Sequence, residues 1–319
     1  MSTSTPVGPA EAVLMASVAR RFYVDGMSKS DIAQQLGMSR FKVARLIDRA
    51  IETGLVQIRI GWPGSLDVTL STDLQERYGL RRALVIDVQD DQPEAQRTAL
   101  GATAAELLSE TVTTADVVGL AWGRSLAAMA RSLRRMAACD VVQLTGALQI
   151  SDDSDSSSVD LVRDVARLGG GAAYYFHIPM IVATGQLGDA LRAQPEVARA
   201  ISRFPAVTKA FVGIGAWYRG GSTVFDALAT NEATDLGRAG VCAEISGILI
   251  DSSGRPVRVP LVRRTIGISA DQLRAVPDVT ALAYGADKAQ AVAAALHSGL
   301  VHGLVTTRDL ATALLARPH

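Results

Sequence analysis

The chain has 319 residues, more than one domain usually contains, so we expect either one small and one large domain or three small ones. Its formal net charge is +0, with 32 basic and 32 acidic residues, which excludes a protein that coats nucleic acid through an evenly basic surface. Residues 1–60 nevertheless hold eight Lys or Arg against five Asp or Glu, so the basic excess lies at the N-terminal end.

The cysteine and histidine residues predict neither a disulfide framework nor a metal centre. Cys139 and Cys242 lie far apart and show no Cys-x-x-Cys spacing, and the histidines form no helical metal-binding pair. The first residues lack a basic start and an apolar core, and no uncharged run reaches the roughly 18 residues that span a bilayer. We therefore expect a cytoplasmic protein with no membrane contact, no metal and no cofactor.

Two short helices are predicted at the N-terminal end. The first covers residues 10–25, where an apolar stripe is formed by Val13, Leu14, Val18 and Phe22. The second begins at Ser28, whose side chain forms a capping-box-like pair with Asp31, and it ends at Gly37. The tight turn at Gly37 separates this helix from a third.

The third helix is the candidate DNA-reading element. Ser39 caps it, Gly54 stops it, and its inward positions are Val43, Leu46, Ile47 and Ala50. Basic side chains face outward near its start and further along, and Arg or Lys can bond the two acceptors of guanine in a major groove. Residues 55–60 alternate like a half-buried strand, which predicts a winged helix-turn-helix over residues 1–60.

We expect the DNA contacts to come from Ser39, Arg40, Phe41, Lys42, Arg45 and Arg49. The alternative is an ordinary solvated helix face, which is the usual fate of such a charge run. The capped glycine turn and the following strand favour the DNA-binding interpretation.

Residues 61–319 predict one large α/β domain after the turn Gly61-Trp-Pro-Gly64. Leu66, Leu70 and Leu74 mark a connecting helix that ends near Gly79. Short apolar runs typical of a buried parallel sheet follow, at Ala83–Val88, Val117–Ala121, Val141–Thr145, Lys209–Ile214, Ile245–Ile250, Val279–Tyr284 and Val301–Thr306. Helices are expected at Ala95–Leu108, Ser125–Met136, Val159–Leu168, Lys288–Leu296 and Asp309–Leu315, and a solvated loop at Ser151–Ser158.

Three strand-to-helix turns suggest a ligand site in this domain. The turn at Gly123-Arg-Ser125 would offer helix amides, a hydroxyl and a guanidinium to an anion. The turns at Gly146 and at Gly285–Lys288 also follow predicted strands. In an open parallel sheet such turns gather beyond the carboxyl ends of the strands, where ligands bind.

The chain resembles the SorC family of bacterial sugar-responsive transcription regulators over nearly its whole length. The resemblance rests on Ser30-Asp-Ile-Ala to Val43-Ala-Arg-Leu, Gly119-Leu-Ala-Trp-Gly-Arg-Ser-Leu, His177-Ile-Pro179, Val212-Gly-Ile-Gly215, Asp251-Ser-Ser-Gly254 and Tyr284-Gly-Ala-Asp-Lys288. It implies an N-terminal DNA-binding domain and a Rossmann-like effector domain of the sugar-phosphate isomerase and deaminase type. It also implies a homodimer or homotetramer.

The resemblance further implies an effector pocket in which Gly123, Arg124 and Ser125 hold a phosphate. Gly146 would line the pocket, Asp251 would bind sugar hydroxyls and Lys288 would lie near the phosphate. The family commonly has threonine in place of Ser125, glycine in place of Ala147 and a Gly-Glu pair in place of Ala286-Asp287. Anion binding survives these departures, but Ala147 puts the identity of the sugar in question.

Each of these residues also has a purely structural interpretation. Asp-x-x-Gly at Asp251 is common in hairpin turns, and Lys288 could simply begin a surface helix. Trp122 is more often a core residue than a ligand platform, and His177 before a proline is more often structural.

The hypothesis is a regulator that binds operator DNA and is controlled by a sugar phosphate, sugar or polyol. One rival is an enzyme of the isomerase or deaminase fold that converts a sugar phosphate, although no acid/base pair is evident and a DNA-binding domain would be superfluous to it. A second rival is an architectural DNA-binding protein whose large domain only oligomerises.

Overall fold

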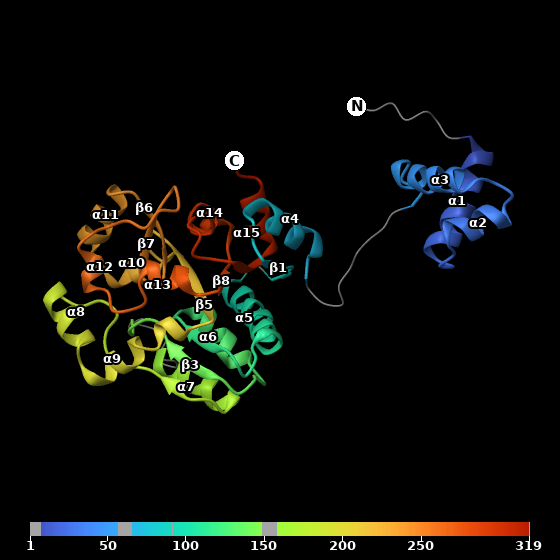
Figure 1. The fold of residues 1–319 in the computed structure, drawn as a ribbon. Coiled ribbons are helices and arrows are strands. Elements are labelled where there is room, and N and C mark those ends of the chain that lie inside the picture. The colour runs from blue at the N-terminus through green and yellow to red at the C-terminus, as the bar shows by residue number, and fades with distance from the viewer. Residues whose placement is uncertain (1–7, 57–65, 91, 149–157, 319) are drawn as a thin grey trace. The chain divides into compact units, whose positions relative to one another are not determined.

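A computed structural model describes residues 8–56, 66–90, 92–148 and 158–318. The chain divides into two compact units, residues 1–61 and residues 62–319 (Figure 1). Among the described helices, none is both long enough and apolar enough to cross a bilayer.

The first unit is a bundle of three helices, α1 (Pro9–Tyr23), α2 (Lys29–Gln35) and α3 (Arg40–Glu52). The two predicted caps are confirmed, because the Ser28 hydroxyl accepts the Asp31 amide and the Ser39 hydroxyl accepts the Lys42 amide, each at 3.2 Å. A separate core holds the bundle together and consists of Met15, Val18, Ala19, Ile32, Ala33, Val43, Leu46, Ile47 and Ala50. The predicted inward face of the third helix is thus confirmed.

The predicted apolar stripe of α1 is wrong at one position. Val13 is 71 % exposed, whereas Met15 lies in the core. Val13, Leu14 and Met15 are consecutive apolar residues, and successive helix positions differ by about 100°, so they cannot share one face. Packing against α2 and α3, rather than local pattern, decides which of them is buried.

The predicted wing falls mostly outside the described residues. Leu55 and Val56 belong to no strand, and residues 57–60 are not described. The boundary turn at residues 61–64 and residues 151–157 of the predicted loop are also outside the described part, whereas Ser158 begins a helix.

The second unit is an α/β domain with a mostly parallel sheet. Its strands are β1 (Arg82–Ile86), β2 (Val117–Leu120), β3 (Asp140–Gln143), β4 (Ala173–Tyr174), β5 (Lys209–Ala216), β6 (Val241–Ile245), β7 (Ile248–Asp251), β8 (Asp278–Ala283) and β9 (Gly303–Thr307). The main sheet has the order β1-β9-β8-β5-β2-β3-β4, and all of its neighbouring strands are parallel. Its apolar strands are buried against the helices that connect them, as the continuous apolar runs predict.

The helices of this unit are α4 (Val68–Tyr78), α5 (Pro93–Thr111), α6 (Arg124–Ser132), α7 (Ser158–Gly169), α8 (Gly185–Arg192), α9 (Pro195–Ile201), α10 (Thr223–Ala227), α11 (Thr230–Arg238), α12 (Leu261–Arg264), α13 (Ala270–Ala275), α14 (Ala289–His297) and α15 (Arg308–Leu315). Short 3₁₀ turns cover Phe204–Ala206 and Ala286–Lys288. Every predicted helix is present with shifted ends, and α6 stops earlier than expected.

Helices α5 and α6 pack closely against each other (Figure 1). Their contact depends on Gly101 of α5, because a Cβ atom there would lie 2.6 Å from the carbonyl carbon of Ala128 in α6. The helix backbones approach too closely for any side chain at this position.

The predicted strand over residues 245–250 is only partly correct. Ile248–Ile250 belong to β7, but Ile245 is the last residue of β6, and the two-residue loop Ser246-Gly247 joins these antiparallel strands into a hairpin. Both loop residues have positive φ, 54° at Ser246 and 82° at Gly247, as a type I′ turn requires. The apolar residues on both sides hide this turn in the sequence.

The hairpin extends from the main sheet through β5. Residues Lys209–Gly213 of β5 pair with β8, whereas Ile214, Gly215 and Ala216 pair antiparallel with β6. The hairpin is therefore held above the carboxyl end of the parallel sheet.

Candidate functional site

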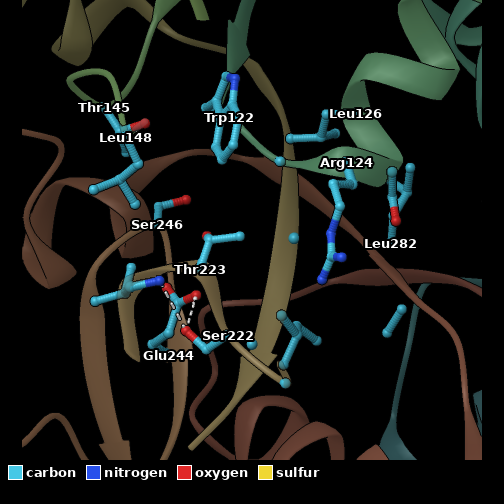
Figure 2. A pocket seen from close by; sticks show the side chains of 18 of the residues that line it. Trp122, Arg124, Leu126, Thr145, Leu148, Ser222, Thr223, Glu244, Ser246 and Leu282 are labelled. Carbon is cyan, nitrogen blue, oxygen red and sulfur yellow. Dashed lines mark hydrogen bonds between the residues drawn. The ribbon is translucent and has the colours of Figure 1, made fainter. Parts of the chain in front are cut away.

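A pocket lies at the carboxyl ends of β2, β3, β5 and β8 (Figure 2). Trp122 follows β2, Thr145 follows β3, and Tyr284 follows β8, while Gly215 belongs to the upper part of β5. The β6–β7 hairpin adds Glu244 and Ser246 to the wall. Its place agrees with the rule that open parallel sheets bind ligands beyond the carboxyl ends of their strands.

One side of the pocket is suited to an anion. Gly123, Arg124 and Ser125 line it at the N-terminus of α6, and Gly123 has no side chain to cap the first amides of this helix. Figure 2 shows the Arg124 side chain extending into the pocket. Helix amides, the positive end of the helix dipole and a guanidinium together favour a phosphate or carboxylate.

Lys288 adds a second positive charge to the pocket lining. Its Nζ lies 5.3 Å from the centre of the Tyr284 ring. Burial lowers the pKa of Lys288, and the positive charge of Arg124 lowers it further, while Asp287 and Glu244 oppose the shift. Because the two cations repel each other, a bound anion would relieve an unfavourable arrangement.

Arg97 of α5 is a third basic group near Lys288, and its charge also lowers the pKa of that lysine. Its side chain is 14 % exposed and pairs with Glu94 at 3.0 Å. Its Nε atom is buried with no hydrogen-bond partner among the described residues. Sequence reasoning missed Arg97, since nothing in a helical segment shows which strand end it approaches.

Glu244 is a buried carboxylate in the wall of the same pocket. One oxygen accepts a hydrogen bond from the Ser222 hydroxyl at 3.1 Å, and the other accepts the Gly247 amide at 3.0 Å. Burial raises the pKa of Glu244, although these two bonds and the charge of Lys288 oppose the rise. A Cβ atom on Gly215 would overlap the carboxylate, so the opposite strand must carry glycine there.

Glu244 and Ser222 were also missed by the sequence analysis. The available signal was a charged residue within the apolar run Val241-Cys-Ala-Glu-Ile245. A charge is rarely buried unless it is paired or used, so this position could have been selected.

The sequence-predicted ligand residues are only partly brought together. Gly123, Arg124, Ser125 and Lys288 line one pocket. Gly146 does not line it: its amide donates to the Ile266 carbonyl at 2.9 Å, and a Cβ atom there would lie 2.7 Å from the Met180 amide nitrogen.

Asp251 also lies outside this pocket. Its Oδ1 accepts hydrogen bonds from the Ser253 hydroxyl at 2.6 Å and from the amides of Ser253 and Arg255 at 2.9 Å. These bonds, led by that of the Ser253 hydroxyl, lower the pKa of Asp251 to about 2. The arrangement is the turn that the alternative interpretation of Asp-x-x-Gly described.

Trp122 and His177 are separated in the structure. Trp122 lines the pocket, and Figure 2 shows its indole above the space between Arg124 and Ser246. His177 lies in a different groove, where its ring is 5.5 Å from that of Tyr175.

The first unit presents a basic helix face. Arg40, Phe41, Lys42 and Arg45 of α3 are exposed, and Phe41 is 85 % exposed. Arg49 differs from them, because it is half-buried and forms an ion pair with Glu11 of α1. The hydroxyl of Ser39 is used as the helix cap.

Within the described ranges, no group of three or more His, Cys, Asp or Glu side chains could hold a metal ion.

The Sugar-bind family model, which describes a sugar-binding domain, matches residues 64–316. The chain belongs to this family. The match covers nearly the whole α/β unit with its pocket, so the predicted resemblance to sugar-responsive regulators is confirmed.

Similar curated proteins match over almost the full chain, the helical unit included. The transcriptional regulator LsrR of Klebsiella pneumoniae subsp. pneumoniae is 28 % identical over 313 residues, covering 96 % of this chain and 94 % of that protein. The sorbitol operon regulator of Klebsiella pneumoniae is 25 % identical, and the match covers 95 % of this chain and 97 % of that protein. The erythritol catabolism regulatory protein EryD of Brucella abortus is 27 % identical, with 93 % and 94 % covered.

Solved structures show the same fold. The full-length sorbitol operon regulator SorC from Klebsiella pneumoniae superposes with a TM-score of 0.73 at 24 % identity, covering 96 % of this chain and 99 % of that one. A DeoR family transcriptional regulator from Listeria monocytogenes gives a TM-score of 0.70 at 23 % identity, with 77 % and 98 % covered. The family model and the near-full-length relatives together identify the chain as a sugar-responsive transcriptional regulator.

Proposed function

We propose that the α/β unit, residues 62–319, binds a phosphorylated sugar or polyol and thereby controls operator binding by the helical unit, residues 1–61. The observation that carries the proposal is the pocket itself. Arg124, Lys288 and the N-terminus of α6 supply positive charge on one side, and Glu244 supplies a hydrogen-bond acceptor in the hairpin. A sugar phosphate carries the matching groups, a dianion and a chain of hydroxyls. This supports an effector domain of the sugar-phosphate isomerase and deaminase type.

The DNA-binding part of the proposal rests on α3. Arg40, Phe41, Lys42 and Arg45 are exposed near the start of a capped helix, which is the part of a recognition helix that meets base edges. Arg49 has a supporting role, because its ion pair with Glu11 fixes α3 against α1. The strand predicted over residues 55–60 would complete a winged helix-turn-helix.

We expect ligand binding to widen the pocket. Its cavity volume is about 70 Å³, whereas pockets for small molecules commonly measure about 300 to 1,000 Å³. A sugar phosphate is therefore expected to displace wall side chains such as Leu148 or Met180. A coupling free energy of about 1 to 3 kcal/mol between the two sites would alter operator affinity about 5- to 150-fold.

We further propose a cytoplasmic homo-oligomer, a dimer or a tetramer. Helix-turn-helix regulators commonly bind as dimers to half-sites about one helical turn apart, so two copies of α3 would read a palindromic operator. The named relatives of this chain are operon regulators, which supports this arrangement.

The test uses an operator selected from random-sequence DNA by the purified protein. Lys42→Ala should weaken operator binding and leave effector affinity unchanged, because only a groove contact is lost. Arg20→Ala, at an exposed position of α1, is the matched control for loss of one positive charge.

The second variant tests the pocket. Arg124→Ala should still bind the operator but should no longer respond to the sugar phosphate found by a thermal-shift screen, whereas Arg131→Ala at the other end of α6 should respond normally. Full effector affinity of Arg124→Ala in calorimetry would show that the anion site is elsewhere. Operator affinity indifferent to every small molecule would favour the architectural protein.

A further inference from the structure

The loop of the β6–β7 hairpin contains a residue that the fold does not require. In a two-residue loop with positive φ at both positions, the favoured residues are Asn, Asp or Gly at the first position and Gly at the second. Gly247 obeys this preference, but the first position is Ser246 with a φ of 54°. Among the described residues, Ser246 is the one non-glycine residue with positive φ.

The side chain of Ser246 does not stabilise the turn. Ser246 is only 8 % exposed, and its hydroxyl forms no hydrogen bond with any described residue. A buried hydroxyl without a partner opposes folding, since it loses its bonds to water and gains none. The residue thus combines a strained backbone with an unsatisfied polar group, two features that persist where function requires them.

The position of Ser246 indicates what that function is. Ser246 lines the same pocket as Arg124 and Glu244. Figure 2 shows its hydroxyl oxygen directed toward the pocket, across from Arg124. A ligand whose phosphate lies at Arg124 would therefore present its carbon chain, with its hydroxyls, toward Ser246.

We propose that Ser246 contributes to recognition of the effector, because its hydroxyl forms a hydrogen bond with one of the hydroxyl groups on the effector's carbon chain. The inference rests on the proposed function and adds a specificity-determining residue to it. Glu244 positions this residue, because its carboxylate accepts the Gly247 amide at 3.0 Å and so holds the turn closed. The Ser246 hydroxyl can donate or accept a hydrogen bond, which suits a polyol or sugar hydroxyl.

The test separates the phosphate end from the hydroxyl end. Isothermal calorimetry measures the affinities of the full-length protein for inorganic phosphate, sorbitol 6-phosphate, erythritol 4-phosphate and ribose 5-phosphate. Ser246→Ala removes the hydroxyl and keeps the Cβ atom, while Ser246→Gly removes the hydroxyl and also relieves the backbone. Ser253→Ala, in the turn beyond the other end of β7, is the matched control.

We expect wild type and all three variants to bind inorganic phosphate equally. Wild type and Ser253→Ala should bind at least one of the organic phosphates more tightly than inorganic phosphate. In both Ser246 variants, the ratio of the affinity for that organic phosphate to the affinity for inorganic phosphate should be about 3- to 10-fold smaller than in wild type. This is the range expected for the loss of one neutral hydrogen bond. Melting should show that Ser246→Gly is more stable than wild type, because the strained serine is gone.

Two results would overturn the inference. In one, both Ser246 variants keep the full advantage of the organic phosphates; in the other, wild type has no such advantage over inorganic phosphate. Neither result contradicts phosphate binding at Arg124. Failure of wild type to bind any of the four probes would instead contradict the proposed function, and the inference would fall with it.

Discussion

At the scale of single residues, Lys288 links the pocket to pH. Its pKa lies below the ordinary 10.5 because of burial and the nearby Arg124. The protonated amine attracts an anion and the neutral amine does not, so anion affinity must fall as pH rises through the lowered pKa. The unfolded chain binds this proton more tightly than the folded chain does. The contribution of Lys288 to the free energy of unfolding therefore increases as pH rises from the lowered pKa to the ordinary pKa.

The corresponding prediction concerns phosphate affinity from about pH 8 up to the ordinary lysine pKa of 10.5, a range in which inorganic phosphate remains dianionic and arginine remains charged. Wild type should bind phosphate progressively more weakly across this range. Lys288→Met should bind more weakly at about pH 8 and show a flat profile. Calorimetry at several pH values checks this, and a wild-type profile as flat as that of the variant would place the lysine outside the anion site.

The sequence predicted the residues that share one local turn and missed those that meet through tertiary structure. Arg124 and Ser125 were predictable because strand, turn and helix start are consecutive. Glu244 and Ser246 reach the pocket only because the hairpin pairs with the upper half of β5. Asp251 was predicted as a ligand residue but lies in a turn outside the pocket. The sequence could not decide this, because Asp-x-x-Gly is equally typical of a turn.

At the scale of secondary-structure elements, long apolar runs were predictable and short irregular segments were not. The strands of the parallel sheet appear as continuous apolar runs, so their existence was predicted with ends shifted by a few residues. Strands β4 and β6 and helices α8 to α13 were missed. Several of these span less than three turns, too little for a clear periodicity, and tertiary contacts rather than local pattern determine them.

The contact of α5 with α6 gives a prediction about stability. Gly101→Ala should lower the free energy of unfolding by about 1 to 3 kcal/mol, because the new methyl group meets the backbone of Ala128. This outweighs the gain in helix propensity of about 1 kcal/mol. Denaturant unfolding measures the change.

Gly237→Ala is the matched control, since Gly237 also lies in a helix, α11. There a Cβ atom would lie 3.5 Å from Trp217 Cδ1, an ordinary contact, so this variant should be as stable as wild type or more stable. Equal effects of the two substitutions would show that close packing is not the reason for glycine at position 101.

At the scale of the whole molecule, the two units have separate cores. The core of the first unit contains only residues of α1, α2 and α3, and the largest core of the second contains only residues from Leu74 onward. The basic excess before residue 60 and the change from helices to alternating strands and helices made this organisation predictable. The separation means that damage to one unit need not reach the other.

Leu46→Ala tests this independence. Leu46 is 5 % exposed in the core of the first unit, and its truncation should destabilise that unit by about 2 to 5 kcal/mol. Hydrogen exchange read by mass spectrometry should speed up in α1 to α3 and stay unchanged in the parallel sheet, and phosphate affinity should not change. Faster exchange throughout the sheet would show that the two units unfold together.

The pairing of the β6–β7 hairpin with only the last three residues of β5 has an evolutionary consequence. A few backbone bonds join the hairpin to β5, and its buried residues Ala243, Ile245, Ile248 and Ile250 pack in the core of the main sheet. The hairpin is thus anchored by these residues, while Glu244 and Ser246 face the pocket and can vary independently of them. Regulators with this architecture can therefore diverge in the sugar they sense through point substitutions in one hairpin, without any change at the proposed anion site at the start of α6.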